Sequence, residues 1–184
     1  MKFSILPILP FIKNLYPISV EPSIDTYAYL GSWHQVATSR STTLLGTGIH
    51  YRNVSAYYNI QYNRKLNQNV ITVFNSGLND KGNYTSIHGY SYIKGNVTTK
   101  RKLHFDKVPF DGNYWIIHLG PIIKKKYQYA IVAGPIHNWF GTRFSLYVLA
   151  RNINDYKLKY KHFVKSWCKQ IGFKMYWNEY VETI

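Results

Sequence analysis

Two residues far apart in the chain have the right side chains for a cation–π contact. Trp33 follows Gly31 and Ser32 near the start of the first apolar run, and Arg151 comes directly after the apolar run 146–150. A guanidinium group is attracted to the face of an indole ring when the two stack. Because these residues lie at the first and the last predicted strand, they can stack only if the sheet curls until its ends meet. The pair therefore predicts a closed β-barrel.

Groups that could act as catalysts are few. An enzyme with its active site in a cavity needs an activated nucleophile or a pair of carboxylates there. Cys168 is the only cysteine and lies on a predicted helix outside the sheet, while the eight acidic residues fall in turns, in tails or at the helix cap. A single cysteine also has no partner for an intramolecular disulfide. We therefore expect a protein without enzyme activity, metal or cofactor.

The elements that must position these residues are short apolar runs separated by turn residues, which is the spacing of a barrel or a sandwich. The 18 Tyr, 5 Trp and 9 Phe residues favour strands. Eight strands are predicted, at 32–39, 54–61, 69–75, 84–94, 102–107, 114–119, 127–133 and 144–150. Eight consecutive antiparallel strands suit an up-and-down barrel whose interior holds one ligand.

After Arg151 the spacing of apolar residues changes from two residues to three and four. Asn154 and Asp155 offer a helix cap and Gly172 an end, and the apolar positions between them are Leu158, Phe163, Val164, Trp167 and Ile171. We expect this stripe to pack on the barrel wall, although a basic amphipathic helix can also lie on a membrane. Residues 173–177 are predicted as a strand on the outer edge. The predicted fold is all-β: an eight-stranded antiparallel up-and-down barrel with one C-terminal α-helix and a short final strand.

Four stretches together resemble the lipocalin family, in particular the bacterial outer-membrane lipocalins, apolipoprotein D and the plant temperature-induced lipocalins. They are YLGSWHQVA at 29–37, VSAYY at 54–58, DGNYWIIHL at 111–119 and YAIVAGP at 129–135, followed by Leu-Ala-Arg at 149–151. The resemblance covers residues 24–184 and implies a lipocalin domain there, with 1–23 as an N-terminal segment. It also implies that Gly31, Trp33 and Arg151 close the barrel floor. Ile136 departs from the acidic residue of the bacterial members, and an extended connection is expected over 137–143.

The resemblance also indicates which side chains face into the barrel. The family's inward alanine on the second strand corresponds to Ala56, and successive side chains of a strand point to opposite faces. On this basis His118 and Leu149 face inward, and the ligand cavity is lined by Ala56, Tyr58, Ile71, Val73, Asn75, Ile87, Ser91, Leu103, Phe105, Tyr114, Ile116, Ala130, Val132 and Tyr147. The asparagine and the three tyrosines are candidates to bind a head group. The alternative for each tyrosine is a core ring whose hydroxyl is satisfied by the protein.

This mostly apolar lining indicates binding and transport or storage of a small hydrophobic ligand, such as a fatty acid or a lysophospholipid. The open mouth of the barrel would carry the apolar pairs 44–45 and 139–140, which suit gating or contact with lipid. The alternative function is an interaction protein that uses the barrel as a scaffold. The basic runs 64–65, 100–102 and 124–126 map to its closed end, where an anionic membrane or an acidic protein could bind.

The formal net charge of +15 fits such a partner, but it fits equally well a set of lysines that only keep the protein soluble. No nucleic-acid recognition motif accompanies the charge, so no specific binding of nucleic acid is expected. At the N-terminus, Lys2 and an apolar stretch interrupted by Pro7 and Pro10 resemble a signal peptide without a cleavage site. The stretch is too short to span a membrane and has no cysteine for a lipid anchor. A secreted or membrane-peripheral location is favoured, and the compartment stays open.

Overall fold

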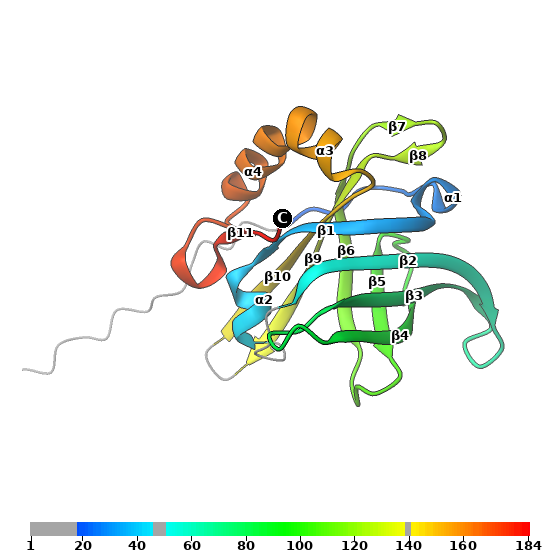
Figure 1. The fold of residues 1–184 in the computed structure, drawn as a ribbon. Helices are drawn as coiled ribbons and strands as arrows, with labels where there is room; N and C mark the ends of the chain where they lie inside the picture. The colour runs from blue at the N-terminus through cyan, green and yellow to red at the C-terminus, as the bar shows by residue number, and fades with distance from the viewer. Residues whose placement is uncertain (1–17, 46–50, 139–140) are drawn as a thin grey trace, which may run out of the picture.

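The computed structural model describes residues 18–45, 51–138 and 141–184. In this part of the chain one antiparallel sheet curls into a closed barrel (Figure 1). Its strands follow one another around the barrel in chain order: β1 (Gly31–Ser39), β2 (Arg52–Asn63), β3 (Gln68–Leu78), β4 (Tyr84–Ile93), β5 (Lys100–Phe105), β6 (Gly112–Leu119), β9 (Tyr129–Asn138) and β10 (Gly141–Ala150). The predicted fold class, an eight-stranded antiparallel up-and-down barrel, is confirmed.

Strand β1 closes the barrel because it pairs with both β2 and β10. Gly31 lies opposite Tyr58 of β2, and His34 lies opposite Ala150 of β10. The start of β1 and the end of β10 therefore meet at one end of the barrel, which we call the closed end. A separate small hairpin, β7 (Ile122–Ile123) and β8 (Lys126–Tyr127), connects β6 to β9 at this end.

The extended connection predicted over 137–143 is wrong. Strand β9 continues to Asn138 and β10 begins at Gly141, and the two remain paired, with His137 opposite Thr142. Both strands thus run further toward the open end than the sequence indicated. The stretch lacks the regular apolar alternation by which a strand is recognised in a sequence.

The C-terminal helix packs on the outside of the barrel, as predicted, but it begins earlier than expected. The side chain of Asn152 accepts a hydrogen bond from the Asp155 backbone at 2.9 Å, so the cap is Asn152 and not the predicted pair 154–155. A short helical turn, α3 (Ile153–Asp155), leads into the five-residue π-helical segment η1 (Tyr156–Tyr160) and then into α4 (Lys161–Gln170).

The π-helical segment explains why part of the predicted apolar stripe is wrong. A π turn holds more residues than an α turn, so the phase of the helix changes there. Leu158 is 82% exposed and Phe163 is 52% exposed, whereas Tyr156, Val164 and Cys168 are buried against the barrel. Gly172, with φ +114°, follows the helix as predicted, since few other residues adopt this conformation.

The final strand exists but lies seven residues later than predicted. Residues 173–177 are not a strand; Phe173 is buried after the helix, and a single helical turn, η2 (Tyr176–Asn178), follows. Strand β11 (Tyr180–Glu182) then pairs with the second half of β1, with Thr38 opposite Val181. Two short helices flank β1 itself, α1 (Thr26–Tyr29) before it and α2 (Arg40–Leu45) after it.

The barrel wall separates two apolar clusters. The outer cluster joins the helix residues Val164 and Cys168 to outward side chains of β1, β6, β9 and β10. The inner cluster fills the closed half of the barrel around Trp33 and Ile116. Because the inner cluster does not reach the open end, space remains there for a ligand.

Candidate ligand-binding site

The closed end of the barrel is built around Trp33, whose side chain is fully buried. The Arg151 guanidinium carbon lies 3.6 Å from the centroid of its ring, and the indole Nε1 donates to the backbone oxygen of Tyr29 at 2.9 Å. The same guanidinium also donates to backbone oxygens of α1 and of the start of β1, including Tyr29 at 2.9 Å and Ser32 at 2.6 Å. Arg151 thus ties α1, β1 and the end of β10 together below the cavity.

Gly31 has a backbone conformation that permits this close contact. Its φ is +101°, which side chains other than glycine rarely allow. A Cβ atom at this position would lie 3.4 Å from Nη1 of Arg151. The structure therefore brings Gly31, Trp33 and Arg151 together at the closed end.

Three tyrosine hydroxyls form a chain above Trp33. The hydroxyls of Tyr29 and Tyr114 are 2.6 Å apart, and Tyr114 donates to Tyr58 at 3.2 Å. A tyrosine has one proton to donate, so Tyr29 donates to Tyr114 and the proton of Tyr58 points elsewhere. Tyr58 and Tyr114 both line the cavity. The chain of hydrogen bonds therefore ends in a donor at the base of the cavity.

Burial keeps these phenols neutral. Desolvation raises the pKa of Tyr58 to about 12, and it raises the pKa of Tyr29 and Tyr114 well above the ordinary value. Burial also raises the pKa of Tyr147 on β10. At neutral pH all four groups are hydroxyls that can donate a hydrogen bond.

A buried guanidinium lies behind this cluster. Arg101, on the inner face of β5, is 4% exposed and donates from Nε to the Ser91 hydroxyl at 2.6 Å and from Nη2 to the Ser91 backbone oxygen at 2.8 Å. No carboxylate of the described residues forms an ion pair with it. Desolvation lowers the pKa of Arg101, but an arginine still carries its charge at neutral pH. The base of the barrel is therefore electropositive.

The cavity above these groups has a volume of about 460 Å³ and opens at the end of the barrel opposite Trp33. Eight of the predicted cavity residues line it: Ala56, Tyr58, Val73, Asn75, Leu103, Phe105, Tyr114 and Tyr147. The Oδ1 atom of Asn75 is buried and has no hydrogen-bond partner within the described part of the protein.

The other six predicted cavity residues lie outside this lining. Ile71, Ile116, Ala130 and Val132 are buried members of the inner cluster that do not reach the cavity. Ser91 is buried against Arg101, and Ile87, opposite Asn75 on β4, does not reach the cavity. Strand alternation tells which face a side chain is on, but not how deep in the barrel it lies.

Several lining residues were not predicted. Gln35 follows Trp33 by two residues on β1, whereas Val108, Phe110, Pro135, Ile136 and His137 come from the open end. Ile136 continues the inward alternation of Ala130 and Val132, so a predicted strand that extended past residue 133 would have included it. Val108 and Phe110 lie between β5 and β6, where no strand pattern exists to indicate a direction.

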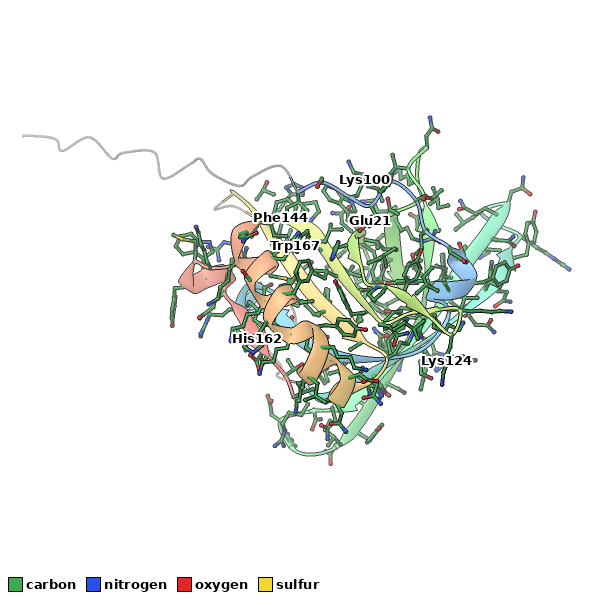
Figure 2. The ribbon with its side chains drawn as sticks, turned by 90° about the horizontal axis from the view of Figure 1, so that it is seen from above. Glu21, Lys100, Lys124, Phe144, His162 and Trp167 are labelled. Atoms are coloured by element: carbon green, nitrogen blue, oxygen red, sulfur yellow. The ribbon has the colours of Figure 1, made fainter. Side chains whose placement is uncertain are left out.

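The inward position predicted for His118 is wrong. The register of β6 and β9 shifts between Ile116 and His118, so Ile117 is an extra residue in a β-bulge. His118 consequently faces outward and stacks on Trp167 of α4, with ring centroids 4.9 Å apart. Its Nδ1 lies 3.2 Å from the carboxylate of Glu21, whose position beside the helix is seen in Figure 2.

The basic residues assigned to the closed end do not form one exposed patch. Arg101 is buried, and the Lys100 ammonium lies 4.9 Å from the centroid of the Trp115 ring. Lys126 donates to the backbone oxygens of Tyr27 and Leu30, which places it against α1. Lys100 and Lys124 are well separated in Figure 2. The expected convergence of these basic runs is therefore not found.

Of the apolar pairs predicted at the mouth, Trp139 and Phe140 lie outside the described residues, as do the side chains of Leu44 and Leu45.

Cys168 lies on the face of α4 that packs on the barrel and is fully buried, and desolvation raises the pKa of its thiol to about 12. Among the residues that the structure describes, no three potential metal ligands come together, and no helix is long and apolar enough to cross a membrane. The expected lack of enzyme activity stays a prediction.

Known proteins match this architecture. The family model of the lipocalin-like domain matches residues 24–179. The solved structure of apocrustacyanin C1 is 17% identical, with a TM-score of 0.64 over 87% of this chain and 79% of that chain. H1 crustacyanin from the lobster Homarus americanus is also 17% identical, with a TM-score of 0.64 over 89% of this chain and 81% of that one. No curated protein sequence matches.

The structural matches and the family model support different conclusions. At 17% identity the structural matches show the fold alone, and the resemblance to the bacterial, apolipoprotein D and plant subgroup stays a prediction. The family model spans most of the chain, from α1 to the residue before β11. The chain therefore belongs to the lipocalin family.

Proposed function

We propose that this lipocalin binds one acyl chain, that of a fatty acid or a lysophospholipid, inside the barrel for transport or storage. The observation that carries the proposal is the cavity of about 460 Å³ inside the barrel, which is lined mainly by apolar side chains. Its volume lies within the range of about 300–1,000 Å³ that is usual for small-molecule sites.

An acyl chain gains enough free energy from such a cavity to bind. Each buried methylene group contributes about 0.8 kcal/mol, so ten of them contribute about 8 kcal/mol. A micromolar complex has a binding free energy of about 8 kcal/mol. Chains longer than ten carbons supply the surplus that offsets the cost of association.

The base of the cavity favours a ligand with an acceptor group at its buried end. The free hydroxyl proton of Tyr58 can donate to a ligand oxygen, and the positive charge of Arg101 lies behind it without a carboxylate of the described residues. A fatty acid that enters with its carboxylate first satisfies both. A lysophospholipid would keep its head group at the open end, near the exposed ring of Phe110.

The test is the displacement of a fluorescent long-chain fatty acid from the purified protein, together with native mass spectrometry to detect a lipid that copurifies. Replacing Val73 with Trp fills the cavity and should weaken binding about tenfold or more. The matched control is Val97→Trp, at a position that is 40% exposed in the turn before β5. Unchanged affinity in a folded Val73→Trp protein would show that the ligand does not bind in the barrel.

A further inference from the structure

A second concave site lies on the outer face of the barrel. It is a groove of about 750 Å³ over the outward side chains of β2, β3, β4 and β5, and it ends at the turn between β2 and β3. The C-terminal helix covers the opposite part of the barrel wall, whereas no helix of the described residues lies over β2, β3 and β4 (Figure 1). This groove shares its strands with the lipid cavity, and Val73 belongs to the lining of both, but their aromatic side chains differ, because Tyr57 and Phe74 face out where Tyr58 faces in.

Aromatic rings lie in two neighbouring rows across the groove. In one row Tyr57, Phe74 and His88 are directly opposite one another on β2, β3 and β4, and the rings of Phe74 and His88 are 4.6 Å apart. In the next row Tyr90 lies opposite His104, with ring centroids 4.9 Å apart. Two residues along a strand separate the rows, which is about 6.8 Å.

Of these rings, Tyr57, Phe74 and His88 are exposed, whereas Tyr90 and His104 are half-buried. Tyr57 is 52% exposed and Phe74 is 37% exposed. Neither ring belongs to one of the two apolar clusters that stabilise the fold. The rows therefore offer flat faces on which another planar group can stack.

The charge of the groove indicates the kind of ligand. Its lining contains two cations at the turn, Arg64 and Lys65, and one carboxylate, Asp106. No ion pair within the described part of the chain involves Arg64 or Lys65. The whole chain carries a formal net charge of +15. Free cations beside exposed rings suit a ligand that combines planar rings with negative charge.

We propose that this groove binds single-stranded nucleic acid without sequence preference, with bases stacked on the rows of Phe74 and Tyr90 and phosphates near Arg64 and Lys65. Base stacking on aromatic side chains accepts every base, and a positive groove attracts the phosphate backbone. A neutral glycan would stack on the rings but leave the two cations unused. A second copy of this chain would bring two strongly positive surfaces together.

The test is fluorescence anisotropy with a labelled single-stranded oligonucleotide, poly-U or poly-dT, at two salt concentrations. Phe74→Ala should weaken binding about fivefold or more by the loss of one stacking ring, and Phe74→Tyr should restore it. Arg64→Glu should weaken binding further at low salt than at high salt. Tyr176→Ala, which removes an exposed ring on η2 outside the groove, is the matched control and should have no effect.

The controls separate stacking from simple attraction between charges. Each variant must still bind the fluorescent fatty acid, because the lipid cavity lies on the other face of the same strands. Duplex DNA of equal length should bind at least about fivefold more weakly than the single strand, since its bases cannot stack on the rings. Equal binding of duplex and single strand, or an unchanged affinity of Phe74→Ala, would overturn the proposal. Displacement of the oligonucleotide by a neutral oligosaccharide would overturn it in favour of a glycan site.

Discussion

Removing the indole of Trp33 tests the architecture of the closed end most directly. In Trp33→Ala the barrel loses its largest fully buried side chain, and Arg151 loses the ring that lies 3.6 Å away. The hydrogen bond from the indole to the Tyr29 backbone is lost as well. All three losses fall on one small region, so the effect on the free energy of unfolding should be large.

The magnitude follows from these contacts. Truncation of a buried Trp costs about 3–5 kcal/mol, and a desolvated cation–π contact contributes up to about 2 kcal/mol of stability. The oxygen of Tyr29 still accepts from Arg151, and Arg151 keeps its backbone partners, so no polar group is left unpaired. We therefore expect a loss of about 5 kcal/mol, near the upper end of the truncation range. For a chain of this length that corresponds to a Tm lower by about 10–20 °C.

The assay is thermal unfolding followed by circular dichroism, with Trp177→Ala as the control. Trp177 is 41% exposed on η2, so its loss should lower Tm by only a few degrees. If Trp33→Ala is too unstable to purify, Trp33→Phe keeps a ring under Arg151 and should lose about half as much stability. Equal Tm values for the Trp33 and Trp177 variants would refute the packing argument for the closed end.

Four further substitutions or treatments follow from the site. Tyr58→Phe removes the terminal donor of the hydroxyl chain and should weaken fatty-acid binding about tenfold, while a probe with no acceptor group at its end binds as before. Arg101→Met removes a buried cation that has no carboxylate partner among the described residues, so thermal stability should change by less than about 1 kcal/mol while fatty-acid affinity falls. Asn152→Ala removes the helix cap and should cost about 1 kcal/mol in a denaturant titration; no change would mean that the cap is not used in solution. Cys168, with a pKa raised to about 12, stays protonated below that pH, so a thiol reagent at pH 8 should label it only after denaturant unfolds the chain.

Some features of this protein could be predicted from the sequence because they depend on local pattern. Short apolar runs identified the eight strands, and the inward alanine that the lipocalin resemblance implies, together with alternation, placed Ala56, Tyr58 and Val73 on the inner face, where the structure has them. The types of Trp33 and Arg151, at the two ends of this pattern, required a sheet whose first and last strands meet. Which side chains share a face is a property of the two-residue period, and that period can be read without coordinates.

Only the tertiary structure shows where single residues are inserted into a strand or a helix and how deep in the barrel each inward side chain lies. One extra residue at Ile117 turned His118 to the outside, and one π-helical segment turned Leu158 to solvent, because an insertion changes the phase of everything after it. Arg101 has the sequence context of an exposed basic run, yet the pleat points it into the barrel. Ile116 and Tyr114 share a face, but only Tyr114 lines the cavity, since Ile116 is fully buried within the inner cluster. That difference depends on how side chains from eight strands pack together, and no single strand contains the information.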